Sequence, residues 1–193
     1  EIANIHNKVC PSYGIDSADI MHEFLANELE ESGQFHIFEE NLYYTRPERL
    51  MKVWPSRFHT YADAVPYIRN AEKLANKVYD GRVDLGNYIP GDGYLMRGGG
   101  PMQVTGRKNY ELFTEFYNKK FGTNITVTEM ANLVRQNLEI GIHSACWVFA
   151  IAKNLIAAAV ADNMKYIVKR INGGYTNMVS RTMFYNLAKK YII

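Results

Sequence analysis

The feature that most constrains the fold is the helical spacing of apolar side chains, which recurs over most of the chain. Ile20 and Phe24 belong to the first such run. Ser17 or Asp16 is suited to cap the start of this helix, and Gly33 is well placed just past its end. The same spacing predicts further helices over 62–79, 108–121, 128–137, 139–161, 162–171 and 178–191. We therefore expect a mainly α-helical protein.

Length and composition indicate one globular domain. The chain has 193 residues, 47% hydrophobic and 22% charged, unlike disordered, collagen-like or coiled-coil chains. We expect a single domain over 1–193, with an N-terminal arm over 1–16, a functional body over 17–193 and a monomeric state. The most apolar run, 145–161, is interrupted by Lys153 and Asn154. It therefore favours a buried core helix over a membrane span, which needs about 20 apolar residues.

Charge and cysteine content exclude several classes of function. The chain carries 22 basic and 20 acidic residues, a net charge of +2, without a long basic run, so nucleic acid is not an expected partner. Only Cys10 and Cys146 are present. We favour reduced thiols, and the sequence leaves open whether the two pair.

His22-Glu23 begins like a zinc-protease helix, but Ala26 stands where the second His is required. We expect no metal and no cofactor.

Residues 80–106 are the exception to the helical pattern, because they hold eight of the chain's 14 glycines. Glycines permit unusual backbone angles and close approach to a ligand, and a long irregular segment in a compact domain is typically functional. Tyr94, Met96 and Met102 are too apolar for a solvated loop. We predict a small packed loop or β-hairpin that lines a cleft.

Acidic residues gather where the first predicted helix ends. The group consists of Glu28, Glu30, Glu31, Glu39 and Glu40. Glu31 falls in the last helical turn, where the helix dipole and partial burial would raise its pKa and keep it protonated. A second carboxylate nine residues on would face it across a cleft. Two carboxylates in different environments are what glycoside hydrolysis requires, although a solvated acidic helix end is the plainer alternative.

Three ordered motifs carry a resemblance to a known family. The segment 24–45, FLANELEESGQF…EENLYYT, resembles the catalytic region of glycoside hydrolase family 19. The segment 98–110, GGGPMQVTGRKNY, and the segment 171–174, INGG, followed by Arg181, are similar to two further motifs of that family. The likeness runs from about residue 21 to 185. It implies a lysozyme-like helical fold and an inverting mechanism without a covalent intermediate.

The resemblance also implies roles for individual residues. Glu31 takes the place of the general acid and Glu40 that of the base which positions water. The resemblance implies sugar binding for Gln103, Thr105, Asn109, Asn172 and Arg181. It also implies that Arg181 supports the acidic pair. The sequence departs from the family where Glu30 replaces a His, Gly99 replaces an Arg and Glu28 replaces an apolar residue. Glu28 therefore remains an alternative acid.

The function expected from these observations is hydrolysis of the β-1,4 bonds of peptidoglycan glycan strands, as in a muramidase or endolysin. Thr176 stands near the position where plant chitinases of the family have an additional Glu, which favours the phage and bacterial lysozyme branch. Chitinase activity on chitin oligomers and non-catalytic glycan binding are the alternatives. No secretory signal opens the sequence. We expect a phage-encoded enzyme that acts at the host wall in the periplasm, or a secreted one.

Overall fold

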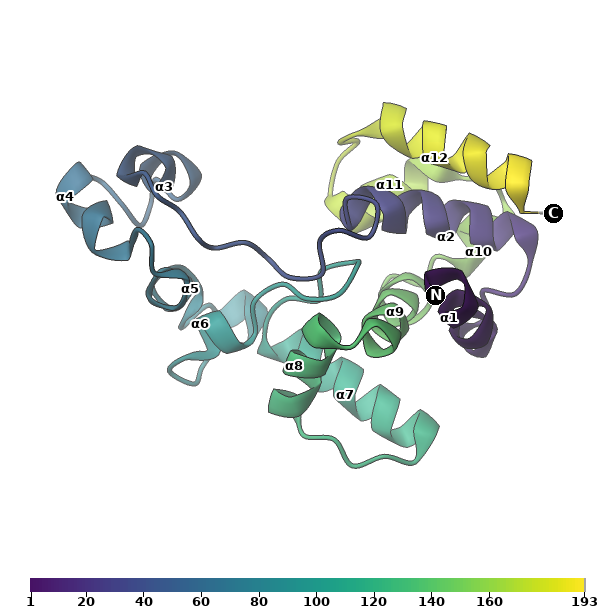
Figure 1. Cartoon of the computed structure of the whole chain (residues 1–193), viewed down its shortest axis with the longest axis horizontal. Helices are drawn as coiled ribbons and strands as arrows, with labels where there is room; N and C mark the ends of the chain where they lie inside the picture. The colour runs from purple at the N-terminus through teal and green to yellow at the C-terminus, as the bar shows by residue number, and fades with distance from the viewer. Residues whose placement is uncertain (193) are drawn as a thin grey trace. The chain divides into compact units, whose positions relative to one another are not determined.

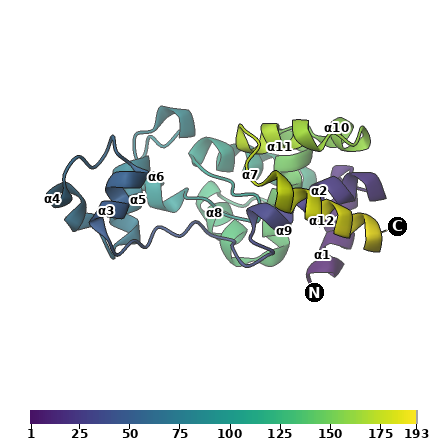
Figure 2. The ribbon, with the colours of Figure 1, turned by 90° about the horizontal axis from the view of Figure 1, so that it is seen from above.

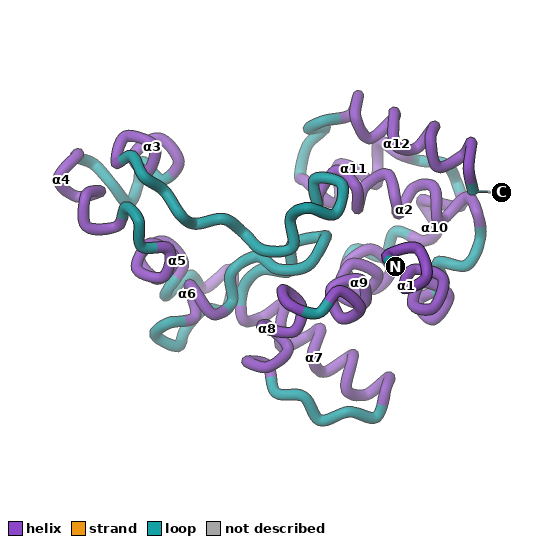
Figure 3. Tube along the Cα trace, viewed as in Figure 1, coloured by secondary structure: helices purple, strands orange, loops and turns teal. Residues whose placement is uncertain are grey.

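A computed structural model describes residues 1–192, in which the backbone consists of helices joined by loops (Figures 1 and 3). The helices are α1 (Ile2–Val9), α2 (Ala18–Glu31), α3 (Pro47–Val53), α4 (Tyr61–Ala64), α5 (Ala71–Tyr79), α6 (Asp92–Leu95), α7 (Arg107–Phe121), α8 (Val127–Gln136), α9 (Leu138–Cys146), α10 (Ile156–Val160), α11 (Met164–Asn172) and α12 (Met178–Tyr191). The expected mainly α-helical, lysozyme-like class is confirmed. Each helix within 1–192 is too short or too polar to cross a membrane.

The chain divides into two compact units, each of which is described by itself. The first unit contains residues 1–38, 99–104 and the segment from Leu133 to the C-terminal end, and the second contains 39–98 and 105–132. The organisation of 1–193 as a single catalytic domain stays a prediction.

The first unit is built around α2, which packs along α12 (Figures 1 and 2). Phe24 of α2 is fully buried, and its ring meets the Phe149 ring edge to face at 5.3 Å between centroids. The expected N-terminal arm contains α1, which packs against α9 and buries Val9. Cys10 and Cys146 are buried free thiols whose sulfur atoms lie 3.6 Å apart.

The second unit has its own apolar core beneath α3, α4 and α5. Its fully buried members are Leu50, Phe58, Ala64, Leu74 and Val78. Aromatic side chains close the edge of this core, among them Trp54 and Tyr79, whose rings meet at 6.4 Å between centroids. The core thereby holds the ring of Tyr79 in place at the end of α5.

Two of the predicted helices are wrong as continuous elements. The helix expected over 62–79 is broken by Pro66, which lacks a backbone N–H, and by Arg69, which adopts φ 56°; Asn70 then caps α5 with its side chain. The helix expected over 139–161 gives way after α9 to a π-helical segment, Trp147–Ala152, and ends before Asn154 at φ 53°. Helix α3 has no counterpart among the predicted helices.

The glycine-rich segment contains α6 and one antiparallel bridge, between Gly99 and Val104. Met96 is fully buried and Met102 is 7% exposed, so the segment is packed; its place along a cleft stays a prediction. Glycine is required at position 93, because a Cβ atom there would lie 2.4 Å from the carbonyl oxygen of Ala75.

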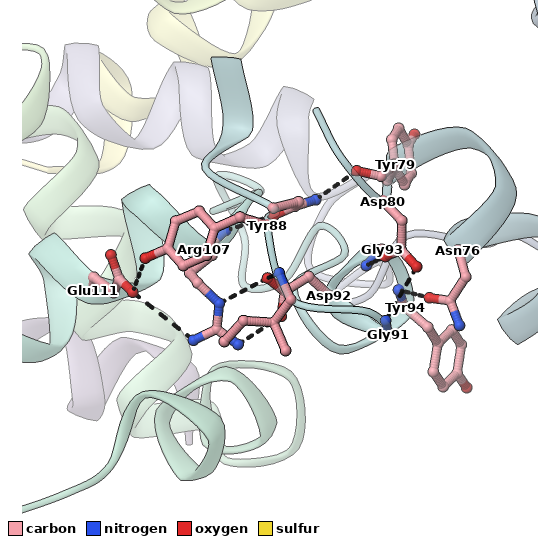
Figure 4. Close-up of polar contacts among 12 residues, drawn as sticks. Asn76, Tyr79, Asp80, Tyr88, Gly91, Asp92, Gly93, Tyr94, Arg107 and Glu111 are labelled. Atoms are coloured by element: carbon pink, nitrogen blue, oxygen red, sulfur yellow. Dashed lines mark hydrogen bonds and ion pairs between the residues drawn. The ribbon is translucent and has the colours of Figure 1, made fainter. Parts of the chain in front are cut away.

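Buried ionic contacts anchor this segment within the second unit (Figure 4). Arg107 donates from Nε to one carboxylate oxygen of Asp92 at 2.7 Å and from Nη2 to the other at 2.5 Å, and both side chains are almost fully buried. The carboxylate of Asp80 accepts the backbone N–H groups of Gly91 at 3.1 Å and Gly93 at 2.6 Å. The Asp80 carboxylate thereby satisfies two backbone donors of the segment.

We expect Asp92→Ala to lower the free energy of unfolding by about 3 kcal/mol, because it leaves the buried Arg107 guanidinium with only the longer contact to Glu111, at 3.8 Å. Urea denaturation measures the change. Asp84→Ala is the matched control, since it removes the exposed partner of Arg82 and is expected to have little effect. Equal losses in the two variants would contradict the importance of the buried pair.

Candidate active site

In the first unit, Glu31 lies at the end of α2 and is held by side chains from two other helices. Arg181 of α12 donates from Nη2 to Glu31 Oε1 at 2.5 Å, and the Glu31 side chain is 21% exposed. In the amide orientation that satisfies both neighbours, Asn172 of α11 donates to the same oxygen at 2.9 Å and accepts from Arg181 at 2.7 Å. Glu31 Oε2 accepts no hydrogen bond within 1–192, so it is the oxygen available to a ligand.

Arg181, the ion-pair partner of Glu31, is itself 2% exposed. Asn27 shares the same arginine, because it accepts from Nη1 at 2.7 Å.

Glu28, the alternative acid, is fully buried and lies against His6, with 2.7 Å between Oε2 and Nε2. Burial works to lower the pKa of His6, but the hydrogen bond and the charge of Glu28 outweigh it and raise that pKa to about 9. The rings of Phe24 and Phe35 flank the imidazole. Glu28 is therefore enclosed beneath α1, where a sugar does not reach it in this structure.

In the second unit, both carboxylate oxygens of Glu40 are held by donors. The Tyr79 hydroxyl donates to Oε1 at 2.7 Å, and the backbone N–H of Gly98 donates to Oε2 at 3.2 Å. The Glu40 backbone N–H in turn donates to the Gly98 carbonyl at 2.9 Å. Burial, followed by the Glu40 hydrogen bond, raises the pKa of Tyr79, so its hydroxyl stays a neutral donor.

The sequence did not single out Tyr79 as a partner of Glu40. The only signal was its place at the end of a predicted helix, within the span of about 21 to 185 that resembles family 19, and neither observation identified a partner for its hydroxyl. The contact joins positions 39 residues apart, which helical periodicity does not predict.

The remaining predicted residues fall into both units. Gln103 lies in the first unit at φ 51°, and its side-chain amide donates to the carbonyl of Gly100 at 3.1 Å. Thr105 and Asn109 lie in the second unit, where the Asn109 amide donates to the Thr105 carbonyl at 2.7 Å. The structure thus brings Glu31, Asn172 and Arg181 together, and separately Thr105 and Asn109.

A hollow of about 280 Å³ lies beside Glu40 within the second unit. Its polar and aromatic lining includes Glu39, Glu40, Asn41, Tyr43, Tyr94 and Arg97. The Arg97 guanidinium lies 3.8 Å from the centre of the Tyr94 ring and donates to Glu39 at 2.8 and 2.7 Å. Carboxylates, an amide and aromatic faces are groups that recognise sugar hydroxyls and rings. No cluster of three or more His, Cys, Asp or Glu side chains within 1–192 is arranged to hold a metal ion.

The mainly helical fold, with Glu31 and Glu40 each fixed by donors, agrees with the class of two-carboxylate glycoside hydrolases. A curated protein of Haemophilus influenzae (strain ATCC 51907 / DSM 11121 / KW20 / Rd), described as a glycosyl hydrolase family 19 domain-containing protein, is 32% identical over 162 residues. The match covers 84% of this chain and 74% of that protein. No family model matches the chain. The chain therefore belongs to glycosyl hydrolase family 19, which confirms the resemblance found in its motifs. Its homology to that family supports a glycoside hydrolase.

The His6–Glu28 pair predicts a specific dependence of stability on pH. The pKa of His6 is raised from 6.5 to about 9 in the folded protein, so its contribution to stability is complete below pH 6.5 and is lost as the pH rises through 9. We expect the difference in unfolding free energy between wild type and His6→Gln to shrink over that range in urea titrations. His36→Gln, an exposed-histidine control, should show no such trend. A difference that grows with pH would contradict the assignment.

Proposed function

We propose that this family 19 hydrolase is a muramidase that cleaves the β-1,4 bonds of peptidoglycan glycan strands by single displacement, with Glu31 as acid and Glu40 as base. The observation that carries the proposal is the contrast between the two carboxylates. Glu31 has one oxygen held by Arg181 and the other open, while Glu40 has both oxygens held by donors. An acid and a base on one enzyme need such different environments.

In the proposed reaction, Glu31 gives its proton to the leaving glycosidic oxygen. The proton sits on Oε2, because Oε1 already accepts from Arg181 and Asn172. Glu40 accepts a proton from the attacking water, whose oxygen bonds to the anomeric carbon as the glycosidic bond breaks. In inverting enzymes about 6.5–9.5 Å separates the acid and base carboxyl groups, which leaves room for the attacking water.

The preference for peptidoglycan over chitin is also part of the proposal. Both polymers are β-1,4-linked N-acetylated sugars and differ in the lactyl-peptide group of muramic acid. Support comes from Thr176, which stands near the position of an additional Glu in plant chitinases.

We propose a setting at the bacterial wall, as a phage endolysin or a secreted enzyme. Rapid cleavage of chitin oligomers with peptidoglycan left intact would favour the chitinase alternative.

Glu31→Gln and Glu40→Gln are each expected to lower kcat by about 10²–10⁴-fold, because each removes a proton-transfer group. Release of reducing ends from purified peptidoglycan measures the effect. Glu30→Gln is the matched control, since Glu30 is adjacent in sequence and accepts a hydrogen bond from Asn177 instead. Activity near wild type in Glu31→Gln would contradict the assignment of Glu31 as the acid, whereas glycan binding without any cleavage by the wild type would support the non-catalytic alternative.

Tyr79→Phe is expected to lower kcat about tenfold with KM unchanged, because it removes a hydrogen bond to the charged base. In the Glu40→Gln background the same change should add little, since Tyr79 acts through Glu40. Tyr67→Phe is the control, because that ring lies in the same apolar core without contacting Glu40. Additive losses in the double variant would assign Tyr79 a merely structural role.

A further inference from the structure

A second hollow, of about 630 Å³, lies next to the Glu40 hollow in the second unit. It is formed by residues 43–52, which follow the candidate base in the sequence, and its charged lining consists of Arg46, Glu48, Arg49 and Lys52. Tyr43, 57% exposed, lines both hollows. The two hollows therefore have one lining residue, Tyr43, in common.

The second hollow carries uncompensated positive charge, and we call it the cationic groove. Arg46, Arg49 and Lys52 are exposed, and none of them forms an ion pair within the part of the chain that the structure describes. Glu48 is the one acidic residue in the lining. Over residues 46–82 there are eight Arg or Lys and four Asp or Glu, whereas the whole chain has a net charge of only +2. Residues 46–82 are therefore one of two basic parts of the chain, the other being residues 153–190, which hold seven Arg or Lys and one Asp.

Two of the three cations of the groove project from α3, a helix that packs on the apolar core of the second unit. Arg49 and Lys52 are three residues apart on α3, which places them on neighbouring positions of one helix face. Leu50 of the same helix is fully buried in the core of the second unit. Because α3 is anchored by that core, the backbone positions from which these two side chains project are fixed.

We propose that the cationic groove binds the acidic peptide carried by muramic acid, and thereby selects peptide-bearing glycan over chitin. This inference rests on the proposed function. The sugar backbones of the two polymers have the same linkage, so selection has to use the lactyl-peptide group, whose carboxylates are absent from chitin. Guanidinium groups pair with carboxylates through two parallel hydrogen bonds. A strand seated at Glu40 would reach these groups past Tyr43.

The test compares kinetics on two matched substrates: soluble glycan strands that carry stem peptides, and the same strands after an amidase has removed the peptides. We expect Arg46→Ala/Arg49→Ala/Lys52→Ala to lower kcat/KM about tenfold on peptide-bearing strands, as three exposed charge interactions imply. The loss should be much smaller on peptide-free strands, which keep only the lactyl carboxylate that the amidase frees. High salt should reduce the wild-type preference in the same way. Lys119→Ala/Lys165→Ala/Lys169→Ala removes the same charge from exposed positions outside the groove and should retain the preference.

Equal losses on both substrates, or equal losses in the groove and control variants, would overturn the inference. So would binding of a wall polyphosphate by the groove without binding of stem peptide. Fluorescence anisotropy with a labelled muramyl peptide measures the groove without catalysis, and binding should be lost only in the groove variant. If the wild type cleaves neither strand, the proposed function fails, while peptide binding still decides whether the groove assignment holds.

Discussion

The Arg181 guanidinium is the interaction on which the first unit and its candidate acid depend. It is 2% exposed and contacts Asn27 and Glu31 of α2 together with Asn172 of α11. A buried charge is costly unless charged or polar partners surround it. The fold therefore keeps α2, α11 and α12 together around this arginine, and the same contacts orient the Glu31 carboxyl. The contacts of Arg181 thus both stabilise the first unit and set the orientation of the Glu31 carboxyl group.

The second unit fixes its carboxylate by different means. Glu40 is held by a neutral hydroxyl and a backbone N–H, from Tyr79 and Gly98, rather than by a cation. The Tyr79 ring is anchored by the apolar core, and the glycine-rich segment that supplies Gly98 is anchored by the Asp92–Arg107 pair. Each carboxylate thus depends on a distinct structural support, so the two environments can be altered independently.

Sequence periodicity predicts the helices well where a single amphipathic face controls them. Helix α12 spans the predicted 178–191, and α7 begins one residue before the predicted 108–121. The breaks at Arg69 and Asn154, both at positive φ, were missed because local backbone geometry leaves little trace in an apolar pattern. The surroundings of Glu31 were incompletely predicted for a related reason. Its contact with Arg181 joins residues 150 positions apart, and only the family resemblance linked them.

The most direct test of the account is mass spectrometry of the products released from purified peptidoglycan, with reducing ends labelled. The account predicts fragments that end in reducing N-acetylmuramic acid, formed by the wild type and absent with Glu31→Gln. Reducing N-acetylglucosamine ends, or the absence of any cleavage by the wild type, would contradict it.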